Sequence, residues 1–270
     1  MKTSLVVLSL GIAFAAQSQD HGHINIGSVG VNQNDPLIFD NAAIFEVATN
    51  YVKTLTFATS GTYAGHYQGN ITFTALAATP AHAGPELNAA ALGSQLYAQL
   101  VAVTGPAGGV FSFWNTGATN PTISLVSGDT GTNTWLISEN DGSPGSDPYG
   151  HFHGRRFTAT KPGIYTVSFR ALDFSTNGTS GRAIHTPSQV MPVYFEAGVT
   201  VKSIEPDVDH THVTFAAPVG KSWVVEASDS LATNAVWTTI SAPIVGDDYF
   251  HEITDDEPVA GNRFYRARGF

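Results

Sequence analysis

Three His-x-His triplets carry the side chains of this sequence that are best suited to chemistry. Ten histidines spread at random over 270 residues would give only about a third of one such pair. A β-strand points residues i and i+2 to the same face, about 6.5–7 Å apart along the strand, so two imidazoles at this spacing can bind one metal ion. The triplets are His21–Gly22–His23, His151–Phe152–His153 and His210–Thr211–His212.

The remaining composition limits which metal such a site would hold. The chain has no cysteine and two methionines, so the available donors are imidazole nitrogens and carboxylate oxygens. This donor set suits Zn(II) or Cu(II) and does not suit Cu(I) or an iron–sulfur cluster.

The first two triplets are the leading candidates. His151 and His153 stand where a loop rich in glycine, proline and aspartate enters a predicted strand, and binding residues concentrate in loops held by a rigid scaffold. The single histidines His66 and His185 could complete a site if folding brings them close to a triplet. The alternative for each histidine is a surface residue that hydrogen-bonds to the backbone. The predicted metal ligands are His21, His23, His151, His153, His66 and His185.

The third triplet lies in an acidic, proline-containing stretch between two groups of predicted strands. Polar and charged residues are common in linkers between domains, whether or not they bind metal. For the cluster of Asp207, Asp209, His210 and His212 we favour a linker over residues 202–212 and keep a metal site as the second interpretation. The cluster is not part of the predicted ligand set.

The N-terminus predicts export. Lys2 precedes an apolar run from Leu5 to Ala16, which is followed by polar residues, as in a secretory signal peptide. The run is too short to span a bilayer, and small residues place the cleavage near residues 15–18. We therefore expect a signal peptide over residues 1–18 and a secreted, periplasmic or cell-surface protein.

Charge and composition narrow the classes of partner and of reaction. A net charge of −10 argues against nucleic acid and anionic membranes as partners, and mildly for cations. The sequence contains no HExxH zinc motif, nucleophile elbow, phosphate loop or dinucleotide fingerprint. An exported chain without cysteine has no disulfides, so it must be stabilised by a hydrophobic core.

The pattern of short apolar runs predicts the fold class. Such runs, separated by glycine, asparagine, aspartate and proline, recur throughout and indicate an all-β protein. We expect an antiparallel β-sandwich over residues 19–201 and a second, smaller β-domain over residues 213–270. Ala43–Ala48 is among the expected strands. In Pro85–Leu100 the spacing of the leucines favours a helical turn or two.

Two short motifs carry a resemblance to a known family. The opening Gly22–Gly27 segment around His23, followed by His-x-His and then by Phe-x₄-Pro-Gly-x-Tyr over Phe157–Tyr165, resembles the actinobacterial surface-anchored repeat, or choice-of-anchor M domain. The resemblance covers about residues 20–198, with Asn25 where that family commonly has an acidic residue. It implies an all-β domain, metal handling outside the cytoplasm beside a metal-uptake system or cell-surface component, and His23, His151 and His153 as the matching residues.

The C-terminal segment carries a resemblance of its own. Trp223–Leu231, Val236–Thr238 and Arg263–Arg266 resemble a small β-module that ends many exported proteins of planctomycetes and verrucomicrobia. These residues are explained by an aromatic core and turns, so no chemistry is assigned to this module, which covers about residues 213–270.

Together these features predict an exported, non-enzymatic β-sandwich that binds Zn(II) or Cu(II), with the metal ion as its partner and with neither nucleic acid binding nor membrane insertion. One alternative is a His-ligated metalloenzyme in which an open coordination position activates water. Another is a structural, adhesive or glycan-binding surface module without metal. The aromatic residues that such a module would use are Tyr63, Tyr67, Phe113, Trp114 and Trp135.

Overall fold

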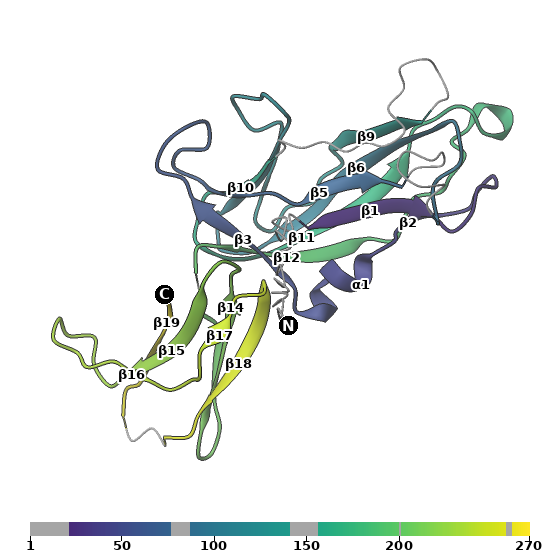
Figure 1. Ribbon diagram of the computed structural model, residues 1–270. Coiled ribbons are helices and arrows are strands. Elements are labelled where there is room, and N and C mark those ends of the chain that lie inside the picture. Colours follow the sequence, from purple (N-terminus) through teal and green to yellow (C-terminus); the bar gives the residue numbers. More distant parts are fainter. Residues whose placement is uncertain (1–21, 77–86, 141–155, 200, 258–260) are drawn as a thin grey trace, which may run out of the picture.

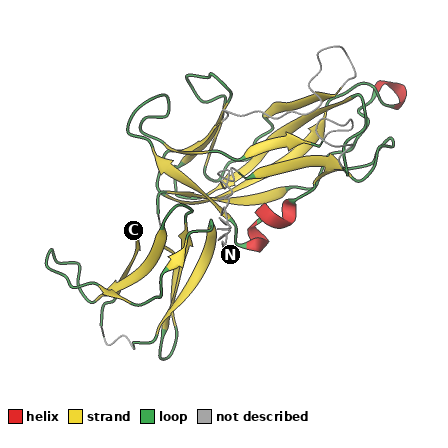
Figure 2. Cartoon of the chain, in the orientation of Figure 1, coloured by secondary structure: helices red, strands yellow, loops and turns green. Residues whose placement is uncertain are grey.

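The structure is a computed structural model that describes residues 22–76, 87–140, 156–199, 201–257 and 261–270. Strands dominate both the N-terminal and the C-terminal part of the chain, which confirms the all-β prediction (Figures 1 and 2). The strands from β1 to β12 form a larger N-terminal domain, and β13 to β19 form a smaller C-terminal domain.

The N-terminal domain contains two sheets. The larger has the strand order β8-β7-β10-β4-β3-β12-β11-β6-β9, and the smaller has the order β2-β1-β5. Most neighbours are antiparallel, but β1 pairs with β5 in parallel, and β12 pairs with β3 in parallel. The strands are β1 (His23–Ser28), β2 (Leu37–Phe39), β3 (Val52–Phe57), β4 (Tyr67–Gly69), β5 (Thr72–Ala75), β6 (Ser94–Thr104), β7 (Val110–Trp114), β8 (Ile123–Val126), β9 (Thr134–Asn140), β10 (Arg156–Ala159), β11 (Gly163–Asp173) and β12 (Met191–Ala197).

Period-two burial explains why β11 forms the centre of the large sheet. From Tyr165 to Asp173, every second residue of β11 is buried, as expected for a strand with one face on a core. Its partner β6 alternates in the same way until Val101, where the pairing shifts between Ser168 and Phe169 of β11. This β-bulge adds one residue to β6 without turning the remaining apolar residues away from the core.

The two sheets share one hydrophobic core. Phe73 on β5 of the small sheet contacts the rings of Trp135, Phe157 and Phe169 of the large sheet, at centroid distances of 5.5, 6.2 and 5.1 Å. Phe73 is 5% exposed. Because a buried aromatic side chain removes a large apolar area from water, this contact holds the small sheet against the large one.

Two local predictions are wrong. The expected strand Ala43–Ala48 is instead a helical turn, α1 (Ala42–Phe45), followed by a 3₁₀ turn, η1 (Val47–Thr49); a second 3₁₀ turn is η2 (Thr179–Gly181). The helical turn closes when Glu46 N–H donates to Ala42 O at 2.9 Å, and it buries Phe45 against Tyr51. Tertiary packing of one aromatic side chain therefore overrides the extended pattern.

The helical turns expected within Pro85–Leu100 are contradicted over the part of this range that belongs to β6. Residues from Ser94 onward are extended and pair with β11 on one side and β9 on the other. Leu96, Ala98 and Leu100 are all buried, because residues two apart in a strand lie on the same face and this face of β6 packs on the core.

The C-terminal domain contains two small sheets that enclose a separate core. Val213, Phe215, Trp223 and Val225 are buried between them. One sheet has the order β13-β14-β18; in the other, β15 pairs with β16, β17 and β19. The strands are β13 (Val201–Pro206), β14 (Thr211–Ala217), β15 (Ser222–Ser228), β16 (Thr238–Thr239), β17 (Ile244–Val245), β18 (Tyr249–Asp255) and β19 (Phe264–Gly269). The range expected as a linker, residues 202–212, thus forms most of a β-hairpin.

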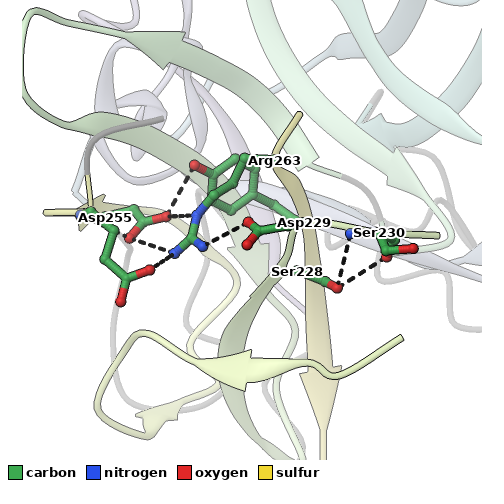
Figure 3. A network of polar contacts seen from close by, with 7 residues as sticks. Ser228, Asp229, Ser230, Asp255 and Arg263 are labelled. Carbon is green, nitrogen blue, oxygen red and sulfur yellow. Dashed lines mark hydrogen bonds and ion pairs between the residues drawn. The ribbon is translucent and has the colours of Figure 1, made fainter. Parts of the chain in front are cut away.

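One polar network ties together the end of the C-terminal domain that carries Asp255 (Figure 3). Arg263 donates from Nε to Asp255 Oδ2 at 2.7 Å and reaches Asp229 Oδ1 at 3.1 Å. Tyr265 Oη also donates to Asp255 Oδ2, at 3.1 Å. Asp255 is only 2% exposed, so this buried carboxylate is compensated by Arg263 rather than by water.

The two domains are joined by backbone and side-chain contacts. Val52 N–H donates to Asp248 O at 2.8 Å, and Phe250 N–H donates to Asn50 O at 3.0 Å. Val52 and Phe250 are also buried in one small apolar cluster with Ala216. The end of β18 that carries Tyr249 therefore lies at the domain junction, and the end that carries Asp255 lies away from it (Figure 1).

Candidate metal centre

The turn between β13 and β14 positions two histidines side by side. Asp207 N–H donates to His210 O at 2.8 Å, and Val208 N–H donates to Asp207 Oδ1 at 2.7 Å, so the two strands are joined by a tight turn. Residue 211 begins β14, whose first residue pairs with Asp255 of β18. The turn therefore lies at the end of the C-terminal domain remote from the N-terminal domain (Figure 1).

His210 and His212 direct the same ring nitrogen toward each other. Their Nε2 atoms are 3.0 Å apart, and the two rings are nearly perpendicular, with centroids 4.7 Å apart. Asp207 Oδ2 lies 3.5 Å from His210 Nε2. One ligand atom from each of the three residues lies within 4.8 Å of the other two, so this group can hold a metal ion. We call Asp207, His210 and His212 the hairpin site.

The outer ring nitrogen of each histidine faces a carboxylate. His210 Nδ1 lies 2.7 Å from Asp209 Oδ1, which fits an N–H donor to a carboxylate. His212 Nδ1 lies 3.1 Å from Glu252 Oε1 of β18, but this contact lacks hydrogen-bond geometry, and the buried nitrogen has no hydrogen bond. We treat the Glu252 contact as an electrostatic one, because its distance is short and its direction is poor.

These contacts fit a metal ion held by Nε2 atoms. Metal-bound histidines commonly present their second nitrogen to a carboxylate, which fixes the ring and strengthens the donor. Ligands about 2.0–2.1 Å from a tetrahedral Zn(II) lie about 3.3 Å from one another. The distances of 3.0 and 3.5 Å around His210 Nε2 bracket that value. Without a cation, the same 3.0 Å contact is a hydrogen bond in which one ring donates from Nε2–H to the Nε2 lone pair of the other; a cation would replace that proton.

The site is open to solvent on one side. The side chains of His210 and His212 are 28% and 31% exposed, and that of Asp207 is 56% exposed. Three protein ligands leave a fourth position of a tetrahedral ion for water or another molecule. The geometry therefore suits an exchangeable ion better than a closed structural one.

The predicted ligands are not brought together in the part of the chain that the structure describes. His21, His151 and His153 lie outside the described residues. His23 is on β1, where its Nδ1 lies 3.1 Å from Thr74 Oγ1. Among the described residues, one group of three convergent ligands occurs, and it contains none of the six histidines predicted from the sequence.

His66 and His185 have other surroundings. His66 packs edge-on against Trp114 at a centroid distance of 5.9 Å. His185 is 3% exposed, with Nδ1 2.9 Å from Asp35 O and Nε2 accepting from Ala91 N–H at 2.9 Å. Both nitrogens of His185 are thus engaged by the backbone, an arrangement that holds two loops together and leaves no lone pair for an ion.

The hairpin site is a cluster that the sequence analysis considered but ranked below the other two triplets. His-x-His is present at residues 210–212, with Asp207 three residues earlier. What the sequence did not reveal is that residues 201–217 form a hairpin, which folds Asp207 back over His210. Glu252 contributes from β18, forty residues along the chain from His212, and only the pairing of β14 with β18 brings it close.

Most of the aromatic residues considered for glycan stacking lie in the interior. Phe113, Trp114 and Trp135 are 1, 3 and 4% exposed. Phe113 stacks on Trp135 at 4.3 Å, and Trp114 Nε1–H donates to Thr158 Oγ1. Phe113 and Trp135 therefore belong to the core, and Trp114 packs against Tyr63 and His66, so none of the three rings is open to a sugar.

Comparison of the chain with protein-family models, with curated proteins and with solved structures found no match. No helix within the described residues is long and apolar enough to cross a membrane.

Proposed function

We propose that this protein is an exported metal-binding protein that captures Zn(II) or Cu(II) at the hairpin site. His210 and His212 supply two Nε2 donors and Asp207 supplies a carboxylate oxygen. The observation that carries the proposal is the facing pair of Nε2 atoms at 3.0 Å, with a carboxylate against the outer nitrogen of each ring.

Electrostatics support cation binding at this end of the domain. Asp207, Asp209 and Glu252 surround the two imidazoles, and Glu205 lies opposite His212 in the β13–β14 register. The whole chain has a net charge of −10. A divalent cation would therefore meet a negative surface potential on approach, which raises its local concentration.

The exposure of the site favours capture and release over a structural role. Structural zinc sites are closed by four protein ligands, whereas the hairpin site offers three and remains open to solvent. The N-terminal sequence, which has the pattern of a secretory signal peptide, supports a place of action outside the cytoplasm.

The proposal is tested by titrating Zn(II) and Cu(II) into the chain and into a His210→Ala/His212→Ala variant. We expect the variant to lose one equivalent of metal bound by the parent chain. His251→Ala is the matched control, because it removes a partly exposed imidazole of the same domain that belongs neither to the hairpin site nor to the predicted ligands, and it should bind as the parent does. Equal stoichiometry and affinity in the parent and the double variant would contradict the proposal.

A His151→Ala/His153→Ala variant belongs in the same experiment. The sequence pattern makes this triplet an independent candidate, so its loss reports on a second site. If this variant loses metal binding while the His210→Ala/His212→Ala variant retains it, the metal is bound by His151 and His153. That result would contradict the assignment to the hairpin.

A further inference from the structure

A pocket of about 350 Å³ lies where the two domains meet. Its walls come from β1 and α1 of the N-terminal domain and from the segment before β18 in the C-terminal domain. The volume lies at the small end of the range for ligand pockets. Since the lining residues come from both domains, the pocket exists only when the domains are docked.

Several polar groups of this pocket have no partner among the described residues. Asp247 Oδ1 accepts from Tyr249 N–H at 3.1 Å and lies 2.9 Å from His251 Nε2, whereas its Oδ2 makes no hydrogen bond within the described part of the chain. The Asp247 side chain is 46% exposed, so a ligand can reach it from solvent. The side-chain amide of Asn25 and the hydroxyl of Tyr249 likewise have no hydrogen bond there. These three residues line one pocket and retain hydrogen-bonding capacity.

The charge of the pocket is negative. Asp247 and Asp248 are adjacent, and the lining contains neither lysine nor arginine. Lys53 Nζ approaches Asp248 Oδ2 at 3.9 Å. Burial nevertheless raises the pKa of Asp248, and the positive charge of Lys53 offsets this only in part. A carboxylate that is buried with incomplete compensation is stabilised by any further cation placed beside it.

Backbone strain is present at the same position. Asp248 has a φ of 61°, a conformation that costs energy for a residue with a side chain. It is held there by three contacts: its N–H donates to Ala217 O, its O accepts from Val52 N–H, and its Oδ1 accepts from Val219 N–H. Such residues cluster at binding sites, where the surrounding structure maintains the strain.

Aromatic rings form the apolar part of the lining. Tyr51 contacts Phe45 at 5.0 Å and Tyr249 at 5.9 Å, in both cases edge to face. A carboxylate beside aromatic rings suits an organic cation, because rings attract positive charge and pack against aliphatic groups. It suits a metal ion poorly, since three convergent ligands are not found here among the described residues.

We propose that this interdomain pocket binds the ammonium group of a small organic amine. Asp247 Oδ2 accepts the ammonium N–H groups, Asn25 and Tyr249 offer further hydrogen bonds, and the rings of Tyr51 and Tyr249 pack against the aliphatic part of the ligand. Binding would contact both domains at once and so stabilise their docked arrangement.

The test compares butylamine with butan-1-ol, which has a similar shape but no charge, by calorimetry and by NMR chemical-shift perturbation at pH 7. The full chain is kept in a metal chelator, so the result is independent of the hairpin site. We expect butylamine to bind at least about tenfold more tightly than butan-1-ol, because a charge-assisted hydrogen bond is lost in the alcohol.

Three variants locate the binding. Asp247→Asn should weaken butylamine binding by at least about tenfold, while Asp247→Glu, which keeps the charge, should retain the preference for the amine over the alcohol. Asp256→Asn makes the same charge change at an exposed residue of the same domain and should bind as the parent chain does. Equal binding of amine and alcohol, absence of amine binding, or unchanged binding in Asp247→Asn would each overturn the proposal.

Discussion

His210 and His212 place their Nε2 atoms 3.0 Å apart at the end of a β-hairpin, and each ring has a carboxylate against its other nitrogen. Alternation along a strand explains why the rings share a face, and the tight turn explains why Asp207 joins them. The arrangement thus combines candidate ligand atoms with carboxylates beside the outer ring nitrogens, as metal sites commonly do. It lies on an exposed hairpin of the smaller domain.

The carboxylate of Glu252 should tune metal affinity without binding the ion. We expect Glu252→Gln to weaken Zn(II) binding by up to about tenfold, because it removes a negative charge beside His212; the contact lacks the hydrogen bond whose loss gives larger effects. Competition against a chromophoric chelator measures the change. Glu205→Gln is the matched control, because it removes one charge from the same hairpin opposite His212. Equal losses in both variants would show a general effect of charge rather than a specific contact.

The Asp255–Arg263 pair should dominate the stability of the C-terminal domain. Asp255 is 2% and Arg263 11% exposed at their side chains. Arg263→Met leaves a buried carboxylate uncompensated, and we expect a loss of about 3–5 kcal/mol at pH 7. Calorimetric unfolding checks this. The exposed Arg182→Met, in the N-terminal domain, should change stability by less than about 0.5 kcal/mol.

The same pair predicts a dependence of stability on pH. Burial alone would raise the pKa of Asp255, but hydrogen bonds from Arg263, Glu257 N–H and Tyr265 outweigh it and lower this pKa below its ordinary value of 3.8. A lowered pKa stabilises the folded state above pH 4 and ceases to do so as the pH falls through the folded-state value. Acid unfolding of the parent should therefore be steeper than that of Asp255→Asn. Parallel curves for the two proteins below pH 4 would contradict this.

A second buried carboxylate organises a loop of the N-terminal domain. Asp173, 7% exposed, accepts N–H groups from Gln95, Ser175, Ile184 and His185 at 2.9–3.0 Å. Asp173→Asn replaces one acceptor oxygen by an N–H donor that faces other donors. We expect a loss of about 2–3 kcal/mol in urea unfolding. Asp129→Asn, at an exposed turn, serves as the control and should unfold like the parent.

Phe73 offers a test of how the two sheets of the N-terminal domain are held together. Its ring inserts among Trp135, Phe157 and Phe169, so Phe73→Ala should leave a cavity between the sheets. We expect destabilisation of about 3–5 kcal/mol, measured by denaturant unfolding followed by tryptophan fluorescence. A cost below about 1 kcal/mol would mean that the small sheet is held mainly by its connections to the chain.

The fold class was predictable because the alternation of apolar residues is strong where one face is buried, as in β11 between Tyr165 and Asp173. The two wrong secondary-structure predictions lie where tertiary contacts determine the local conformation. The turn at Ala42–Phe45 depends on burying Phe45, and β6 depends on hydrogen bonds from strands on both sides.

The kind of side chain that makes up the hairpin site was predictable, but its convergence at the hairpin was not. His-x-His spacing identified paired imidazoles as candidate ligands, yet the same spacing occurs three times. Choosing among the triplets requires knowing which carboxylates fold beside them, and the position of Glu252 against His212 depends on strand pairing across forty residues. No local pattern contains that information.

X-ray absorption spectroscopy of the Zn(II)-loaded chain, beside its His210→Ala/His212→Ala variant, tests the hairpin site most directly. We predict a zinc ion with two imidazole nitrogens and oxygen ligands at about 2.0–2.1 Å, and loss of the imidazole scattering from one bound ion in the variant. An identical spectrum and zinc content in the two proteins would contradict metal binding at His210 and His212.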